Sequence, residues 1–466
     1  MPSRNRWSLA AILLSAAASL PFAAPVLFAQ KETPPEGGPP KPFHSPARDV
    51  FTLPNGLKVT LARYGMIPKV TVELVLRGGY LLEPKGKDGV ANLMAALMKE
   101  GTASRSAKQI ADDAASFGGN ITVQAAADQV TIHAEGLSDS ADKMVALVAD
   151  VALHPAFPES QLARLKADQL RTISIARSTP QTIAEEHFRK IVYGDNGYGR
   201  VLPDEAALKS VTVEDIKTYY AKQFAAGDAR LYIAGDYSGD LRPAVQTAFS
   251  GWSKGKSPDI PKIKAETKRT LDVVDRPGAP QSTIYMGLPV ITPGSPDYIR
   301  LQVANSLLGG SFMSRVTSNI REDKGYTYSP YSLLENNAQN GVWAQHADVT
   351  TKYTGASLHE IDSEIDRLRR EAPPQKELTG IQNGMAGIFI LRNSSREGIV
   401  NMLNYVDLHR LPSDYLDTYI GKMYAVKPPD VQGMMEKYID PGKMTIVVVG
   451  DKSQIDSQLA PYQPKP

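Results

Sequence analysis

A strand-like run that ends in Gly-Asp occurs twice in this chain, and this repeat constrains the fold more than any other feature. The first copy is residues 233–236 (IAGD), and the second, in the C-terminal half, is residues 448–451 (VVGD). Each copy follows a helix-like segment that ends in an aromatic residue, Phe224 or Tyr438. A chain of 466 residues is also too long for one ordinary domain. The repeat therefore predicts two related modules of about 200 residues each.

Apolar periodicity indicates what each module contains. The apolar runs 50–53 and 57–61 flank residues 54–56 (PNG), and Asn-Gly between such runs predicts a β-hairpin. Thr212 followed by Asp215 predicts a capping box at a helix start. By the same patterns we expect further strands at 70–76, 121–124, 130–133 and 231–234, and helices at 89–99, 107–116, 140–153, 159–176 and 182–192. The predicted fold class is α+β, with two homologous modules, each an antiparallel sheet packed with helices.

Composition changes along the chain predict the boundaries. Arg4 and Arg6 precede an apolar run, which is the pattern of an export signal. Residues rich in Pro and Gly follow, and they predict a flexible spacer. We expect a signal peptide at 1–29, the Pro/Gly-rich linker at 30–47, the first module at 48–253, an inter-module linker at 254–268 and the second module at 269–457.

The signal predicts a periplasmic or otherwise exported protein. Its apolar run, residues 7–28, is about long enough to span a bilayer, so an uncleaved membrane anchor is the alternative. Pro21 and Pro25 near the end of the run favour cleavage. The chain has no Cys, which excludes disulfides, thiol catalysis and thiolate metal sites.

Several function classes find no support in the sequence. The chain has 52 Lys and Arg residues against 50 Asp and Glu residues, which gives no electrostatic reason to expect nucleic acid as a partner. No GxSxG motif occurs, so a serine nucleophile elbow is not expected. Residues 251–257 (GWSKGKS) are one residue short of a P-loop and lie largely in the expected linker, so nucleotide binding is not expected.

Short motifs occur in a fixed order along the two halves. They are RGG at 77–79, GVA at 89–91, EGT at 100–102, LGGSFMSR at 308–315 and IREDKGYTYS at 320–329. In this order they resemble the insulinase/pitrilysin zinc metallopeptidases, in the branch similar to the mitochondrial processing peptidase. The resemblance covers about residues 48–455.

Active members of that family carry an inverted zinc motif, HxxEH, on the helix after Gly-x-Ala. Positions i and i+4 share one helix face, so both His side chains reach one Zn²⁺ while the Glu deprotonates the bound water. The matching positions here are Asn92, Ala95 and Ala96. The family's third ligand is a Glu on a later helix, where this chain has Thr172. The resemblance therefore implies a degenerate zinc site, no metal bound by this chain, and no catalytic residue on this chain alone.

The histidines do not suggest another zinc site. They are His44, His133, His154, His187, His346, His359 and His409, and no two lie three to five residues apart. His359-Glu360 resembles the start of HExxH but lacks the second His. Separate surface or core histidines are the expected interpretation.

The resemblance implies a role for Arg321 and Tyr328. Some members of this branch work as pairs of chains, in which one chain carries the zinc motif and the other an Arg and a Tyr that face the zinc across a chamber. Arg offers a rigid fork of donors for substrate carbonyls, and Tyr an O–H for the scissile carbonyl. We expect Arg321 to end a helix, Gly325 to turn the chain and Tyr328 to start a strand. From the residues alone, the alternative is that Arg321 caps its own helix and Tyr328 packs in the sheet.

Gly309 and Gly310 allow two interpretations. A Gly-rich loop at this point resembles the substrate-sampling loop in the non-catalytic subunit of the processing peptidase. With only two adjacent glycines, a plain turn fits equally well.

The sequence thus predicts a catalytically inactive, substrate-binding subunit of a heterodimeric zinc peptidase. An HxxEH-bearing partner would supply the zinc, and the substrates would be peptides held in extended form, for which strand addition at a sheet edge is one mode. The alternative is a peptide-binding or scaffold protein with no peptidase role. Arg321 and Tyr328 argue against a scaffold, since a scaffold needs neither.

Overall fold

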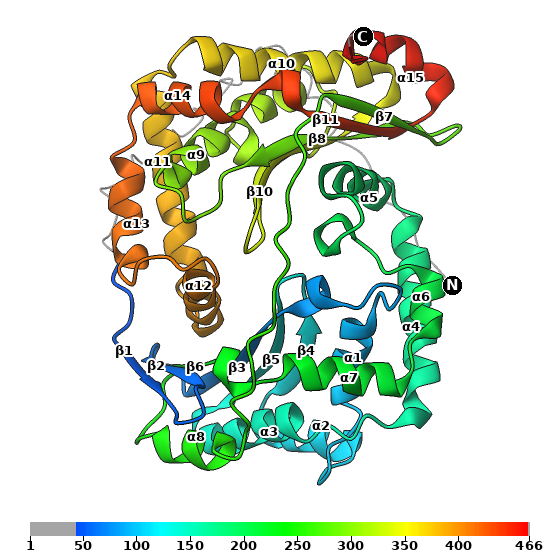
Figure 1. Cartoon of the computed structure of the whole chain (residues 1–466). Helices are drawn as coiled ribbons and strands as arrows, with labels where there is room; N and C mark the ends of the chain where they lie inside the picture. The colour runs from blue at the N-terminus through cyan, green and yellow to red at the C-terminus, as the bar shows by residue number, and fades with distance from the viewer. Residues whose placement is uncertain (1–42, 465–466) are drawn as a thin grey trace, which may run out of the picture. The chain divides into compact units, whose positions relative to one another are not determined.

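Each half of the chain forms one β-sheet in the computed structural model, which describes residues 43–464 (Figure 1). The first sheet has the strand order β1-β2-β6-β3-β5-β4, and the second β7-β11-β8-β10-β9. The strands of the first sheet are β1 (Arg48–Thr52), β2 (Lys58–Arg63), β3 (Lys69–Arg77), β4 (Asn120–Ala125), β5 (Gln129–Leu137) and β6 (Ala229–Gly235). Those of the second are β7 (Thr270–Asp275), β8 (Gln281–Val290), β9 (Tyr331–Asn336), β10 (Gly341–Thr350) and β11 (Thr445–Gly450). The predicted signal and most of the predicted 30–47 linker lie outside the described residues.

The two sheets share one topology, which confirms the predicted fold class. From β2 to β4 in the first sheet and from β7 to β9 in the second, the strands follow the same order, and β1 is an addition to the first. The Gly-Asp repeats end β6 and β11, which hold equivalent places. Each of these strands pairs in parallel with one neighbour and antiparallel with the other. The sheets are therefore mixed rather than wholly antiparallel, because the last strand of each module returns after several helices and enters the sheet interior.

Local sequence signals place the first elements correctly. Residues 54–56 connect β1 to β2, which pair antiparallel as the predicted hairpin, and Gly56 has a φ of 93° that favours glycine. Asn55 donates from Nδ2 to the carbonyl of Phe249 at 2.8 Å, which fastens the turn to the C-terminal end of a distant helix. The predicted capping box at Thr212 and Asp215 is present.

In the first half, the predicted helices are all present. They are α1 (Val90–Met98), α2 (Ala107–Ser116), α3 (Ala141–Leu153), α4 (Glu159–Arg177), α5 (Pro180–Tyr193) and α7 (Val213–Gln223). α6 (Glu205–Ser210) and α8 (Arg242–Phe249) are two short helices that the sequence analysis did not predict. The second half contains α9 (Tyr298–Asn305), α10 (Thr354–Arg370), α11 (Gln375–Arg392), α12 (Arg396–Leu408), α13 (Tyr415–Tyr424), α14 (Pro428–Tyr438) and α15 (Lys452–Leu459), with π-helical segments at Ser306–Gly310 and Thr317–Asp323.

One helix of each half covers the sheet of the other half (Figure 1). On α5, Phe188 stacks on Tyr285 of β8 with ring centroids 4.4 Å apart. On α12, Asp407 accepts a hydrogen bond from the hydroxyl of Tyr232 in β6 at 2.7 Å and pairs with Lys58 in β2 at 3.0 Å. Each sheet thus depends for part of its core on a helix that is distant in sequence.

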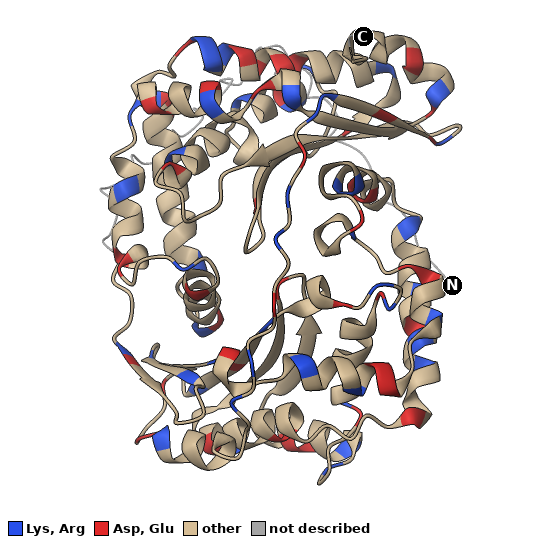
Figure 2. Ribbon diagram, in the orientation of Figure 1, with Lys and Arg blue, Asp and Glu red and all other residues tan. Residues whose placement is uncertain are grey.

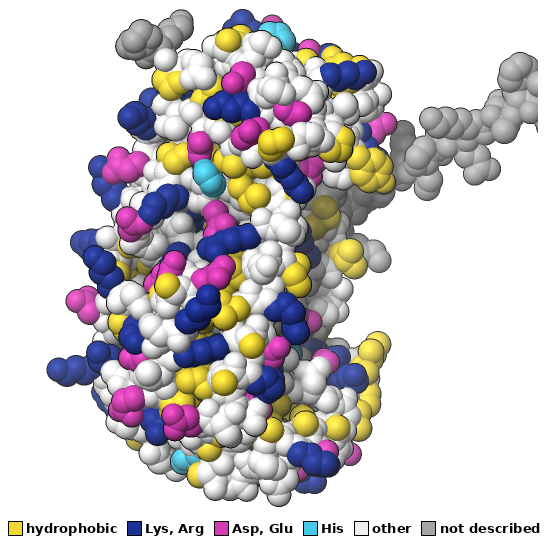
Figure 3. Space-filling view, turned by 90° about the vertical axis from the view of Figure 1, so that its right-hand side faces the viewer, with side chains coloured by type: hydrophobic (Ala, Val, Ile, Leu, Met, Phe, Trp, Pro, Cys, Tyr) yellow, Lys and Arg dark blue, Asp and Glu magenta, His cyan; other side chains and the backbone are white. Residues whose placement is uncertain are grey.

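The surface carries charges of both signs. Acidic and basic residues are spread along the helices (Figure 2). On the face in Figure 3, Lys and Arg intermix with Asp and Glu. This face therefore has no broad field of one sign. None of the described helices is long and apolar enough to cross a membrane.

Candidate functional site

The four positions that the sequence analysis interprets as a degenerate zinc site line one pocket of the first module. α1 buries Leu93, Met94 and Leu97 in the core, which turns its other face, with Asn92, Ala95 and Ala96, toward the pocket. Thr172 reaches the same pocket from α4. The pocket has a volume of about 430 Å³ and is lined by Asn92, Ala95, Ala96, Lys99, Val123, Gln124, Ala125, Gln169, Thr172, Ile173, Val201, Leu202 and Pro203.

The side chains at these positions do not fit a zinc ion. The two Ala methyl groups have no donor atom, and the Asn92 amide is a poor zinc ligand. Thr172 donates its hydroxyl to the carbonyl of Asp168 on its own helix at 3.0 Å. Within residues 43–464, no group of three His, Cys, Asp or Glu side chains is placed to hold a metal. These positions therefore do not provide the ligands that a zinc ion would need.

The same pocket runs along an edge strand. Val123, Gln124 and Ala125 belong to β4, which is the last strand of its sheet and pairs only with β5 among the described strands. Its outer main-chain groups are therefore free to pair with an added strand. The pocket thus lies beside the free edge of a sheet and has, among the described residues, no ligands for a metal.

Glu83 is a buried acid beside this pocket that the sequence analysis did not identify. One carboxylate oxygen accepts hydrogen bonds from the backbone N–H groups of Gly89 and Ala91, both at 3.0 Å, at the start of α1. The other lies 3.3 Å from a guanidinium nitrogen of Arg200, which also pairs with Asp88. Burial raises the pKa of Glu83 to about 7, against the opposing effects of the backbone donors and Arg200. No local pattern around Glu83 could have revealed this role, because its partners come from two other segments.

We expect a Glu83→Gln variant to show a different pH dependence of stability from the unaltered chain. Since the folded-state pKa is about 7 and the ordinary value 4.5, the native state holds a proton that the unfolded chain loses between these values. The free energy of unfolding of the unaltered chain should therefore fall, relative to the variant, by about 3 kcal/mol between pH 4.5 and pH 8. Urea unfolding of both proteins across this range measures the difference, and a constant difference would contradict the prediction.

Arg321 and Tyr328 lie together at the surface of the second module. Arg321 is in the π-helical segment Thr317–Asp323, and Gly325 turns the chain with a φ of 64°. The guanidinium carbon of Arg321 lies 4.9 Å from the centre of the Tyr328 ring. Tyr328 is 79% exposed and precedes β9 instead of starting it, so it does not pack in the sheet. The structure thus brings the two predicted residues into contact.

Phe312 is a third member of this cluster that sequence reasoning missed. The centre of the Phe312 ring lies 4.5 Å from the guanidinium carbon of Arg321. The rings of Phe312 and Tyr328 therefore both contact the guanidinium group of Arg321. Phe312 is 68% exposed, and the neighbouring Met313 is also exposed. The signal in the sequence was the pair of apolar residues that follows Gly309-Gly310-Ser311, at a point where a turn would normally be polar.

The two glycines are required by close packing. A Cβ on Gly309 would lie 2.6 Å from the Ser332 hydroxyl oxygen, and one on Gly310 would lie 2.5 Å from the amide nitrogen of Asn305. Both glycines belong to the π-helical segment Ser306–Gly310. Gly310, Phe312 and Met313 are the exposed residues of this region, whereas Gly309 is buried.

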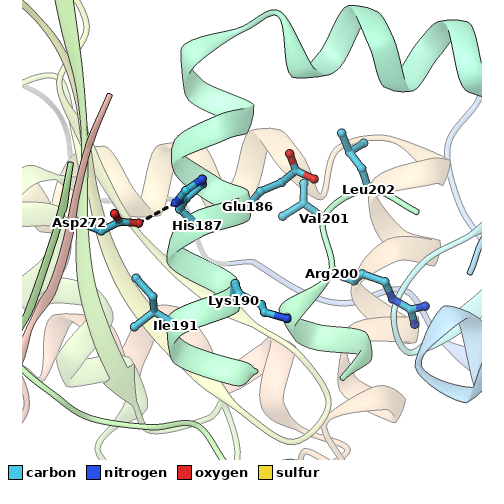
Figure 4. Close-up of a pocket in the computed structure, with 9 residues that line it drawn as sticks. Glu186, His187, Lys190, Ile191, Arg200, Val201, Leu202 and Asp272 are labelled. Carbon is cyan, nitrogen blue, oxygen red and sulfur yellow. Dashed lines mark hydrogen bonds and ion pairs between the residues drawn. The ribbon is translucent and has the colours of Figure 1, made fainter. Parts of the chain in front are cut away.

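Another pocket, of about 480 Å³, lies between α5, residues 199–202 and β7 (Figure 4). His187 points toward Asp272, and the imidazole Nδ1 lies 2.6 Å from the carboxylate. Lys190 pairs with Asp195, and Glu186 lies 3.5 Å from Arg177. Since these charged groups already have partners within the chain, the pocket offers no free acid–base pair.

Comparison with known families gives two matches, which together span more than half of the chain. The family described as "Insulinase (Peptidase family M16)" matches residues 58–204, and the one described as "Peptidase M16 inactive domain" matches residues 210–385. Among curated relatives, an "uncharacterized zinc protease YmxG" of Bacillus subtilis is 23% identical over 386 residues, covering 82% of this chain and 94% of the relative. A "non-peptidase homolog YmxG" of Helicobacter pylori is 21% identical, covering 84% of this chain and 90% of the relative.

Two solved structures have the same fold over most of the chain. A peptidase M16 inactive domain from Pseudomonas fluorescens aligns with a TM-score of 0.80 at 25% identity, covering 86% of this chain and 98% of that one. A protease from Helicobacter pylori also aligns with a TM-score of 0.80, at 18% identity, covering 87% of this chain and 100% of that one. The second likeness shows the fold alone.

Proposed function

Because the chain belongs to the insulinase family of peptidases, family M16, we propose that it is the non-catalytic, substrate-binding subunit of an exported, heterodimeric zinc peptidase. A homologous partner chain with an intact HxxEH motif would hold the zinc. The complex would hydrolyse peptides in the periplasm or another exported location. The name of the Helicobacter pylori relative, a non-peptidase homolog, and the inactive-domain description of the Pseudomonas fluorescens structure support a member that has lost catalysis.

The observation that carries this proposal is the exposed contact between Arg321 and Tyr328. A tyrosine that is 79% exposed and stacks on an arginine contributes little to the core of its own chain. The Tyr328 hydroxyl and the guanidinium of Arg321, whose Nε pairs with Glu322 at 3.1 Å, hold the remaining donors, and a bound peptide would offer carbonyl oxygens to them. A scaffold protein would have no use for this arrangement.

In the proposed complex, Arg321 and Tyr328 would bind the substrate, and the partner chain would activate the attacking water. The partner's zinc would supply an activated water. The Arg321 guanidinium would donate hydrogen bonds to substrate carbonyls and hold the peptide in register. The Tyr328 hydroxyl would donate to the scissile carbonyl oxygen as it gains negative charge. Since such a donor acts mainly on the transition state, its loss should lower kcat more than it raises KM.

The first test is affinity purification of the chain from its native host, with mass spectrometry of the proteins that come with it. We expect a stoichiometric partner that contains HxxEH.

In the purified complex, Tyr328→Phe should lower kcat for peptide hydrolysis by about 100-fold, the effect of removing one oxyanion donor. The matched control is Tyr331→Phe, which alters a neighbouring tyrosine that is also exposed and should leave kcat nearly unchanged.

Two results would overturn the proposal. One is a purified chain that comes without an HxxEH partner. The other is a chain that, by itself, holds stoichiometric zinc and cleaves peptides in a chelator-sensitive way. In the first case a peptide-binding or scaffold role would become the better interpretation.

A further inference from the structure

The second module has a pocket of its own at the place equivalent to the degenerate zinc site. The pocket has a volume of about 450 Å³. It lies along α9, β9 and α11, and α12 and α13 complete it. The pocket of the first module lies along α1, β4 and α4. β4 and β9 are the end strands of two sheets with the same order, so the two pockets occupy corresponding positions in the repeat.

Aromatic rings and amide groups dominate the lining, and we call the site the tyrosine pocket. It is lined by Tyr298, Gln302, Asn305, Ser306, Gly310, Ser332, Leu333, Leu334, Asn336, Met385, Ile388, Phe389, Arg392, Asn393, Met402, Tyr405, Tyr415 and Tyr419. Phe389 and Tyr419 stack with ring centroids 4.5 Å apart and form part of an apolar wall. Flat aromatic walls of this kind bind apolar or aromatic side chains with little loss of conformational entropy.

Three buried amide oxygens in the lining have no hydrogen-bond partner among the described residues. They belong to Gln302, Asn336 and Asn393, and Asn393 is only 1% exposed. An unpartnered acceptor in such surroundings is costly, and each of these oxygens is almost fully enclosed, so it meets an N–H donor of a ligand only if its side chain turns toward the pocket. Backbone amides of a peptide are donors of that kind.

The neighbouring strand edge accounts for how a peptide would lie. β9 is an end strand that pairs only with β10 among the described strands, and its Ser332 and Leu334 main-chain carbonyls accept hydrogen bonds from the side-chain amides of Asn305 and Asn336. Ser332, Leu333, Leu334 and Asn336 of this strand line the pocket. A peptide added to β9 would therefore replace these two side-chain amides as the partner of the strand, and it would direct alternate side chains into the pocket.

The charge of the lining indicates which end of a peptide fits. Arg392 is the only charged residue that lines the pocket, and its side chain is exposed at the C-terminal end of α11. No carboxylate of the described residues lies within 4.0 Å of it. A guanidinium in this position is complementary to a carboxylate, which it can bind through two parallel hydrogen bonds.

From this geometry we propose that the tyrosine pocket is a peptide-anchoring site, distinct from Arg321 and Tyr328, that binds the apolar or aromatic residue at the carboxyl-terminal end of an extended peptide. The residue's side chain lies among the tyrosines, and its carboxylate pairs with Arg392. The inference rests on the proposed function in taking a peptide as the ligand. It adds a specificity determinant, since peptides with apolar carboxyl ends would bind best.

The test uses the absence of Cys in the chain, because a single introduced cysteine is then the only thiol. Ser306→Cys places a thiol in the pocket lining, and a bulky maleimide attached after folding fills the pocket without disturbing assembly. The probe is a dye-labelled ten-residue Ser/Ala peptide that ends in Phe with a free carboxylate, and binding to the full chain is followed by fluorescence anisotropy. The matched control is Ser250→Cys with the same maleimide, at an exposed position in the first module.

We expect the Ser306 conjugate to bind the probe at least about tenfold more weakly, and the Ser250 conjugate to bind it normally. A probe that ends in Ser should also bind weakly. Arg392→Gln should weaken binding of the free-acid probe and leave that of a carboxyl-amidated probe unchanged. That contrast separates a terminal carboxylate from other contacts of the arginine.

The inference is overturned if the Ser306 conjugate keeps full affinity, if the Ser-ended probe binds equally well, or if the unmodified chain does not bind the Phe-ended probe. These outcomes can be told apart from failure of the proposed function. If Arg321→Ala weakens binding and pocket filling does not, the tyrosine pocket is excluded while the proposed function stands. If pocket filling weakens binding but no HxxEH partner is found, the pocket stands while the paired-peptidase role fails.

Discussion

A variant that carries Asn92→His, Ala96→His and Thr172→Glu is expected to bind one zinc ion, which the unaltered residues at these positions do not fit. The three positions line one pocket, two of them at i and i+4 on α1 and the third on α4. None of the three is buried, so the larger side chains fit without repacking of the core. With zinc at about 1,000 times its Kd, binding should stabilise the folded state by about 4 kcal/mol. Zinc content by mass spectrometry and the rise of Tm with zinc concentration measure the effect.

The matched control is the double variant that lacks Thr172→Glu. It has two imidazoles but no acidic ligand, so we expect much weaker zinc binding and a smaller rise in Tm. If the triple variant binds no more zinc than the unaltered chain, α1 and α4 do not direct these positions to a common point. The interpretation of the pocket as a degenerate zinc site would then be wrong.

A Phe188→Ala variant is expected to lose about 3–5 kcal/mol of unfolding free energy, as is usual when a buried phenylalanine is truncated. Phe188 belongs to α5 in the first half of the chain but is 1% exposed, because it packs on Tyr285 of the second sheet. Gly287 makes room for the ring, since a Cβ there would lie 3.2 Å from Phe188. Chemical denaturation followed by circular dichroism measures the loss.

Phe312→Ala is the matched control for this change, because it removes the same atoms from a side chain that is 68% exposed. We expect its stability to change by less than about 0.5 kcal/mol. A loss of less than 1 kcal/mol in the Phe188→Ala variant would mean that α5 does not dock on the second sheet. The interpretation that the two halves share a hydrophobic core would then be wrong.

Local signals were enough to predict most elements of the first module. The Asn-Gly turn, the capping box at Thr212 and the apolar stripe of α1 each involve residues close in sequence, so their physics can be read from the chain directly. The repeat of Gly-Asp likewise predicted two modules, since equivalent strands keep equivalent sequences. The parallel pairing of β6 and β11 was not predicted, because it depends on where a returning strand enters the sheet.

The candidate site was predicted in part. The family motifs pointed to Asn92, Ala95, Ala96 and Thr172, and these residues share one pocket in the structure. Their interpretation as former zinc positions, like the substrate contacts of Arg321 and Tyr328, stays a prediction that the experiments above test. Glu83 and Phe312 were missed, since each has its role only through residues or segments that folding brings beside it.

By itself, the sequence determined most strands and helices of the first module, the repeat, and the absence of zinc-binding side chains at Asn92, Ala95, Ala96 and Thr172. These follow from the identity and local spacing of residues, which folding cannot change. Only the tertiary structure decided that α5 packs on the second sheet and α12 on the first. It also decided that Glu83 is buried with a raised pKa, and that tyrosines and unpartnered amides lie together beside β9. The physical reason is that burial and desolvation depend on contacts between segments far apart in the chain, whose free energies no local pattern records.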